Sequence, residues 1–152
     1  MTMETFFADC LNNMQELHSD IGNALEGLSL EALDWSPKPG VNPISVLVVH
    51  LTGSQKFLFG EVIQGQDVHR DRDAEFRAKG LTSSQLTQRL TGSLEFIKSV
   101  MEGLTPADLD RKCMFRTREV TVGWVIGHSL KHTATHLGHI QVMRDMWLHL
   151  NS

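Results

Sequence analysis

Four of the chain's eight histidines lie between residues 128 and 139, at positions 128, 132, 136 and 139. On a helix, steps of three and four residues place side chains on one face, so these imidazoles form a single stripe. A half-buried row of imidazoles is costly unless its ring nitrogens have partners, and a divalent metal ion is a common partner. The spacing therefore predicts a metal site on this helix.

The spacing also limits which histidines can share one ion. His128 and His136 are separated by about 12 Å of helix rise and cannot both reach an ion at roughly 2.1 Å. Pairs four residues apart can, which leaves His128/His132 and His132/His136, with His136/His139 as a looser third pair. His132 belongs to both of the stronger pairs.

A fifth histidine lies on a different apolar segment. His50 shares its helical face with Val46, Leu47, Ser54 and Phe57, which indicates a position facing the core. A lone histidine there is usually a core residue bonded to a backbone carbonyl. The histidine row on the C-terminal helix favours a shared site instead.

Hydrophobic periodicity and helix-capping residues predict four long helices, over residues 5–28, 42–64, 82–103 and 121–150. Asn42 and Pro43 are expected as the N-cap and first residue of the second helix, and Thr105-Pro106 starts a short extra turn. Residues 111–120 alternate like a strand but look too short and isolated to form a sheet. We therefore expect an all-α fold, an up-down four-helix bundle with long crossover loops, as a single domain over residues 1–152. Bundles of this kind build metal sites from facing helices.

Composition narrows the class of partner. A net charge of -4 and the lack of a basic helix face argue against nucleic acid. We expect no membrane span and no secretory signal, since no long apolar run is present. Two well-separated cysteines, Cys10 and Cys113, fit a reduced, cytoplasmic protein without a disulfide. A small molecule is the expected partner.

Several segments together resemble the DinB-like (DinB/YfiT-like) superfamily of metalloenzymes. Trp35-Ser-Pro-Lys-Pro-Gly-Val-Asn42 resembles the segment that leads into its second helix, where His50-Leu51 then matches a family histidine. Residues 71–80 resemble a linker found in one branch. The run from Val122 to His139 contains the terminal His-x-x-x-His-x-Gly-[Gln/His] pattern. The resemblance extends over nearly the whole chain.

This resemblance implies a bundle in which His50, His132 and His136 hold a divalent ion such as nickel, zinc or iron. Characterised relatives transfer or isomerise substrates with a low-molecular-weight thiol, such as bacillithiol or mycothiol, and homodimers are common. The resemblance therefore implies a metal-dependent, thiol-using transferase or isomerase that acts on a small electrophile.

The ligand chemistry leaves other functions open. Three neutral imidazoles leave a coordination position free, which is the catalytic pattern. A thiol or a water molecule that enters there is acidified, so a hydrolase can use the same residues. A non-catalytic or stress-associated metal protein would close the site with a fourth ligand such as His128 or His139. A bundle without a metal would bond its histidines internally.

The remaining candidates have weaker signals. His139 either orients a ligand or lies at a subunit or loop contact, and His128 is expected to pack under Trp124 rather than reach a substrate. Arg116 and Arg118 can bind a substrate carboxylate or simply form a solvated loop. Cys113 has no base near it in the sequence and is a poor nucleophile. Three further histidines are expected at the surface, namely His18, His69 and His149.

Overall fold

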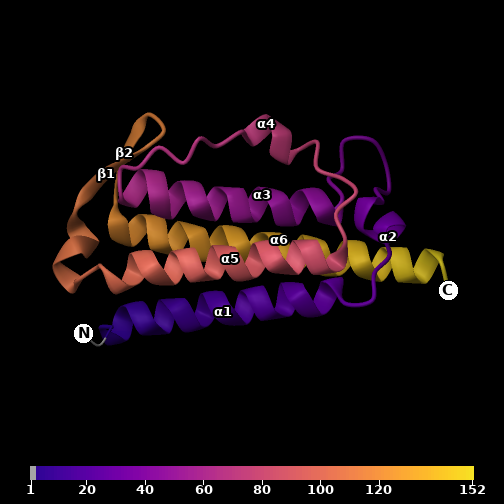
Figure 1. Cartoon of the computed structure of the whole chain (residues 1–152), viewed down its shortest axis with the longest axis horizontal. Helices are drawn as coiled ribbons and strands as arrows, with labels where there is room; N and C mark the ends of the chain where they lie inside the picture. The colour runs from indigo at the N-terminus through magenta and orange to yellow at the C-terminus, as the bar shows by residue number, and fades with distance from the viewer. Residues whose placement is uncertain (1–2) are drawn as a thin grey trace.

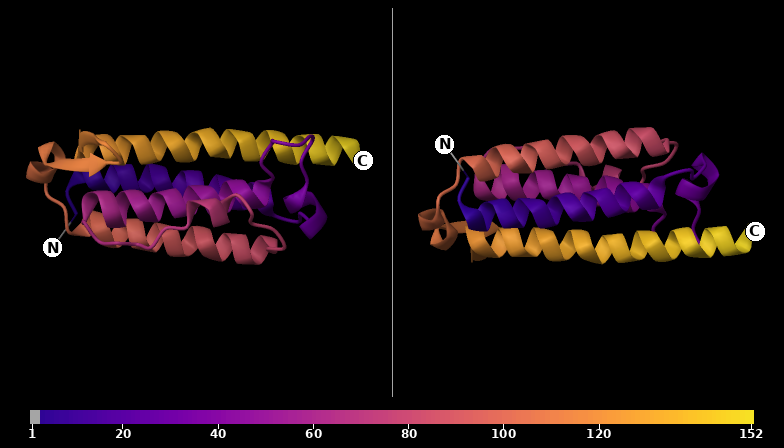
Figure 2. Two further views of the ribbon diagram at one scale, coloured as in Figure 1. Left: turned by 90° about the horizontal axis from the view of Figure 1, so that it is seen from above. Right: turned by 90° about the horizontal axis from the view of Figure 1, so that it is seen from below.

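Four long helices form the body of the protein in the computed structural model, which describes residues 3–152 (Figure 1). They are α1 (Thr5–Leu25), α3 (Ile44–Lys56), α5 (Ser83–Glu102) and α6 (Val122–Leu150). Both α1 and α3 pack against α5 and α6, which closes the bundle. The views in Figures 1 and 2 show α1 and α6 running one way and α3 and α5 the other. The expected all-α bundle is confirmed.

Two of the expected helix boundaries move for local reasons. The first helix ends at Leu25 rather than residue 28, because Gly27 has a φ of 75° that no continuing helix adopts. Residue 28 instead precedes a short helix, α2 (Leu30–Asp34), which Ser29 caps. The second helix begins at Ile44, with Pro43 at the N-cap rather than inside the first turn.

The last turns of the second helix are wider than α-helical. After Lys56 the chain continues as a π-helix, η1 (Phe57–Ile63), before it turns at Gly65. Such wide turns are rare and often occur beside functional sites. Here η1 carries Phe57 and Glu61 toward the connection that follows.

A long connection over residues 64–82 returns the chain across the bundle to the start of α5. Figure 1 shows it passing over α3, with the short helix α4 (Arg72–Glu75) midway. Gly53 of α3 leaves room for it, because a Cβ there would overlap the Glu75 carboxylate. The capping box of Thr82 and Gln85 then starts α5 at the expected position.

The segment before α6 corrects one expectation. A 3-10 turn, η2 (Pro106–Asp110), follows the expected start at Thr105 and leads into β1 (Lys112–Phe115) and β2 (Arg118–Thr121). These strands pair antiparallel, so the segment does form a small sheet. It is not isolated, because Phe115 packs against Phe57 and Trp124 with ring centroids 6.3 and 5.3 Å apart.

The bundle core consists of two apolar clusters separated by a polar layer. Gln55 lies in the middle of this layer and donates to His18 Nε2 at 2.8 Å and to Thr133 Oγ1 at 2.9 Å. Ser93 donates to Gln55 Oε1 at 2.6 Å. The layer therefore ties α1, α3, α5 and α6 together at one level, which fixes how they align along the bundle axis.

His18 is part of this layer, so its expected place at the surface is wrong. Only 5% of the residue is exposed, and its Nδ1 donates to the Leu90 carbonyl at 3.1 Å. Its sequence neighbours gave no sign of this because the partners come from other helices. His69 and His149 are exposed, as expected.

One stretch is long and apolar enough to cross a membrane by length and composition alone. It covers Ile44–Ile63, which includes α3 and η1, and 78% of its most apolar window is buried inside the bundle. A buried core helix passes the same test.

Candidate metal centre

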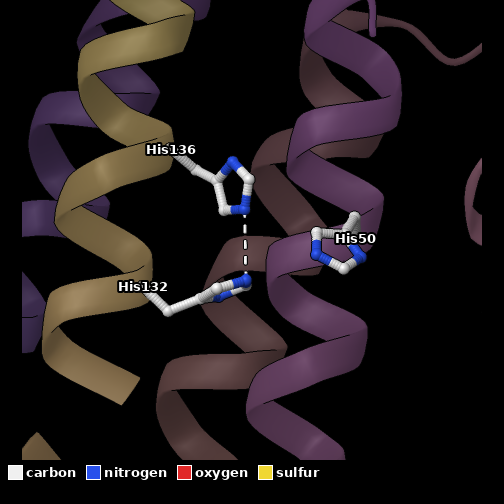
Figure 3. A group of neighbouring side chains, drawn as sticks. All are labelled: His50, His132 and His136. Atoms are coloured by element: carbon white, nitrogen blue, oxygen red, sulfur yellow. Dashed lines mark hydrogen bonds between the residues drawn. The ribbon is translucent and has the colours of Figure 1, made fainter. Parts of the chain in front are cut away.

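Two of the histidines on helix α6 lie one turn apart and face α3 (Figure 3). The Thr121 hydroxyl accepts from the Trp124 N–H at 3.1 Å and so fixes where the helix starts. Eleven and fifteen residues further on, His132 and His136 point toward α3 with their Nε2 atoms 3.1 Å apart. Both side chains are partly buried, on the face between α6 and α3 (Figure 3).

His50 completes the cluster from α3. Its ring centroid is 5.2 Å from the rings of both His132 and His136. Each of the three residues offers one ligand atom, and these atoms all lie within 4.8 Å of one another. Nitrogens bound to one ion at roughly 2.1 Å lie about 3–4 Å apart, so small side-chain adjustments bring the cluster to that spacing.

A hydrogen bond to a buried carboxylate orients His50. Its Nδ1 lies 3.1 Å from Glu75 Oε1, and a carboxylate can only accept, so Nδ1 carries the proton. Nε2 is then left with a free lone pair, on the ring edge that Figure 3 shows facing the other two histidines. Arg70 holds the same carboxylate through two hydrogen bonds of 2.8 Å. A carboxylate that accepts the second ring proton in this way commonly stands behind histidines that bind metals.

The surroundings keep the imidazoles neutral. Burial lowers the pKa of His132 to about 3, with a further contribution from His136 and His50. Burial together with His50 and His139 lowers the pKa of His136 to about 4. The pKa of His50 is also lowered, mainly by burial and against the opposing effect of Glu75. Neutral imidazole is the form that binds metals, so the cluster is ready to do so at neutral pH.

The donor set fits a divalent cation. Without an ion, only one of the facing Nε2 atoms of His132 and His136 can carry the proton between them. In that state one ring donates and the other accepts. A cation accepts the lone pairs of both rings and of His50 at once, so it satisfies three nitrogens that a single proton cannot.

The other two histidines of the row lie outside the cluster. His128 stacks on Trp124, as its sequence predicts, with centroids 4.6 Å apart and an interplanar angle of 11°. Its ring lies 6.1 Å from His132 and nearly parallel to it, so the two do not converge on a shared point. His139 is exposed, with its ring 5.6 Å from that of His136.

Both arginines of the hairpin are exposed and lie outside the histidine cluster. Arg116 occupies the turn with a φ of 58°, and its guanidinium lies 5.2 Å from the Phe115 ring. Arg118 lies 4.6 Å from the Trp124 ring. Cys113, on β1, is a free thiol whose pKa is raised by partial burial, which disfavours the nucleophilic thiolate.

Two residues of the site have no role assigned by sequence reasoning. Arg70 and Glu75 belong to the connection between helices, where hydrophobic periodicity carries no information. The one sequence signal is the linker over residues 71–80, whose resemblance marks Glu75 without indicating its contact with His50.

Comparison with known proteins identifies the family. The DinB superfamily model matches residues 14–140. This chain belongs to the DinB superfamily. The match includes α3, α4 and the histidine pair of α6, and therefore the whole candidate metal centre of this DinB protein.

Solved structures agree with the DinB fold. A crystal structure of a conserved protein from Enterococcus faecalis is 12% identical, covers 94% of this chain and 96% of its own, and has a TM-score of 0.79. A DinB-like protein from Bacillus subtilis is 19% identical, covers 91% of each chain, and has a TM-score of 0.70. At these identities the likeness concerns the fold. A search of curated proteins finds no match.

Proposed function

We propose that this protein is a divalent-metal-dependent enzyme whose ion is held by His50, His132 and His136. The observation that carries the proposal is the convergence of three neutral imidazoles from two facing helices. In the described part of the chain, no fourth histidine, cysteine or carboxylate joins this group. Three protein ligands with an open position are typical of catalytic rather than structural sites.

The reaction that we propose is a thiol-dependent transfer or isomerisation of a small electrophile. A divalent ion at this site would supply Lewis acidity that favours the thiolate form of a bound thiol near neutral pH. In a transfer, the sulfur forms a bond to an electrophilic carbon, and the leaving group departs with the electron pair of the broken bond. The thiol proton is released to solvent. Family membership supports this class over hydrolysis, which the same ligands would allow.

The protein's own residues would orient the ligands and shield the site. Glu75 holds the proton of His50 on Nδ1, and Arg70 holds that carboxylate in place. Phe76 lies 4.9 Å from the His50 ring and covers one side of it. Nickel, zinc and iron all accept three imidazoles, so the donor set does not select among them.

Metal content is the first measurement. Purified protein, measured by mass spectrometry, is expected to hold about one divalent ion per chain, either as isolated or after loading with nickel, zinc or iron. The His132→Ala variant should lose this ion, whereas the exposed His149→Ala variant should keep it. Wild-type protein that takes up none of the three metals would overturn the proposal.

The thiol step is tested separately with loaded protein. A thiol should react with an electrophilic probe such as a chlorodinitrobenzene faster in the presence of wild type than in the presence of His132→Ala. Equal rates, with the ion bound to the wild type, would exclude the thiol reaction but leave the metal site standing.

A further inference from the structure

Several cations lie near the histidine row, besides the Glu75 carboxylate that contacts His50. Burial is the main cause of the lowered pKa of His50; Glu75 opposes it, and Arg70 and Arg72 add a smaller lowering effect. On the side of His128, the nearby charges are Lys131, Arg118 and Arg116. Cations therefore lie near both ends of the histidine row, Arg72 on the α4 side and Arg116 and Arg118 on the hairpin side, although the chain as a whole has a net charge of -4.

Three of these cations, Arg72, Arg116 and Arg118, form what we call the arginine rim. Each rests against an aromatic ring, at 4.6 to 5.2 Å from its centroid. Stacking of this kind holds a guanidinium in place and leaves its N–H edge available. The rings involved are Phe76, Phe115 and Trp124.

These aromatic rings connect the arginine rim to the histidines. Phe76, under Arg72, lies 4.9 Å from the His50 ring. Phe115 and Trp124 lie 5.4 and 4.6 Å from the ring of His128, which in turn stacks toward His132. Arg72 is therefore separated from His50 by one ring, and Arg116 and Arg118 are each separated from His132 by two rings.

The arginine rim has no ion-pair partner among the described residues. Arg70 is committed to Glu75, but within residues 3–152 none of the three rim guanidinium groups forms an ion pair. A free guanidinium presents a planar pair of donors that matches a carboxylate or a phosphate.

Part of the rim faces a cavity of about 410 Å³ between η1, the connection and the hairpin turn. Arg70, Arg72 and Arg116 line it together with Phe57. Two carboxylates, Glu61 and Asp67, also line it, and Asp67 Oδ2 lies 3.2 Å from His69 Nδ1. The cavity has room for a small organic molecule, and its wall combines guanidinium donors with an aromatic ring.

We propose that the arginine rim binds the anionic group, a carboxylate or a phosphate, of a small organic substrate or cosubstrate. The molecule's reacting end then lies at the three histidines. This inference rests on the proposed function and names its substrate class. An ion held by three neutral imidazoles brings no negative charge with it, so an anionic substrate suits this site better than a neutral or cationic one.

Paired thiols that differ in one group test the inference. 3-Mercaptopropionate carries a carboxylate where 2-mercaptoethanol carries a hydroxyl. Binding of each to cobalt-loaded protein is followed by the thiolate-to-cobalt absorption band, which needs no turnover. The variants are Arg72→Gln/Arg116→Gln and, as a control, Arg89→Gln, an exposed arginine on α5.

We expect 3-mercaptopropionate to bind wild type about tenfold more tightly than 2-mercaptoethanol, the effect of one charge-assisted contact. The double variant should lose this preference while its affinity for 2-mercaptoethanol stays the same, and Arg89→Gln should behave as wild type. Equal binding of the two thiols, or a preference that survives in the double variant, would overturn the inference. The cobalt spectrum itself would still support the metal site.

An experiment on metal-free protein tests the arginine rim independently of the proposed metal site. Succinate and inorganic phosphate are titrated into chelator-treated protein by calorimetry at low ionic strength, where screening is weakest. Binding that the double variant abolishes supports the rim even if cobalt fails to load, and the tighter of the two probes identifies the anionic group. If neither anion binds the metal-free wild type, the rim inference is overturned, while the metal site is still judged by the uptake of nickel, zinc or iron.

Discussion

Glu75 accepts a hydrogen bond from His50, with Nδ1 and Oε1 3.1 Å apart, although the two residues belong to different helices and lie 25 positions apart. The carboxylate is itself fixed by Arg70 and is only 6% exposed. The contact sets both the tautomer and the direction of the one candidate ligand that α3 supplies. It makes the connection over residues 64–82 part of the site rather than a simple link between helices.

Replacing Glu75 should therefore weaken metal binding. In Glu75→Ala the Nδ1 proton of His50 has no acceptor, and we expect metal affinity to fall about 10- to 100-fold. Glu75→Asp, whose shorter carboxylate can still accept, should recover part of the loss. Affinity is measured by competition with a chromophoric chelator. Glu61→Gln, on η1, is the matched control, and an unchanged affinity in Glu75→Ala would contradict the positioning role.

Gly53 leaves the space that the Glu75 carboxylate occupies when it contacts His50. A Cβ at this position would overlap the Glu75 carboxylate, so Gly53→Ala should push α4 outward and separate Glu75 from His50. We expect a lower melting temperature and a loss of metal affinity similar to that of Glu75→Ala. At Gly92 on α5 the space is open, so Gly92→Ala should be neutral or stabilise by up to about 1 kcal/mol.

A double variant decides whether the effect of Gly53→Ala passes through Glu75. In Gly53→Ala/Glu75→Ala the overlap is gone, so the second substitution should add little to the loss of metal affinity. Fully additive losses would mean that Gly53 acts through some other contact.

Features decided within one helix could be predicted from the sequence. The caps at Thr82 and Thr121 placed the starts of α5 and α6, and the four-residue step between His132 and His136 placed both on one face. These outcomes depend on backbone geometry that repeats every turn. The family resemblance added His50, which helical spacing alone could place only on a core-facing stripe.

Features decided between elements could not be predicted in this way. The contact of Glu75 with His50 depends on where the connection crosses α3, and His18 is buried by Gln55 and Leu90 from two other helices. The hairpin exists because Phe115 packs against η1 and α6. No local pattern encodes such contacts.

His128 and His139 should be dispensable for the ion. Neither lies in the three-histidine cluster, so His128→Leu and His139→Leu are expected to retain about one ion per chain under loading conditions that leave His132→Leu empty. His128→Leu should also lower stability by about 1 kcal/mol, because Trp124 loses its stacked partner. Metal content and thermal unfolding report the two effects separately. Loss of the ion in His128→Leu would favour the His128/His132 pair instead.

The free energy of unfolding should decrease as the pH decreases, because His18 is held neutral in the folded protein. Burial lowers the pKa of this residue, against the opposing effect of its bonds to Leu90 and Gln55, so the folded protein keeps it neutral. The unfolded chain takes up a proton near pH 6.5. The stabilisation is therefore fully present above that pH and is lost as the pH falls below it, at up to about 1.4 kcal/mol per pH unit.

The variant His18→Gln isolates this contribution from that of the metal-site histidines. At pH 8 we expect it to be about 1–3 kcal/mol less stable than wild type, because the polar layer loses a partner. Since glutamine does not titrate, the difference should shrink as the pH falls to 5. Urea unfolding of chelator-treated protein at each pH gives the two curves, with His149→Gln as the exposed control. A difference that stays constant over this range would show that His18 is not held neutral in the polar layer.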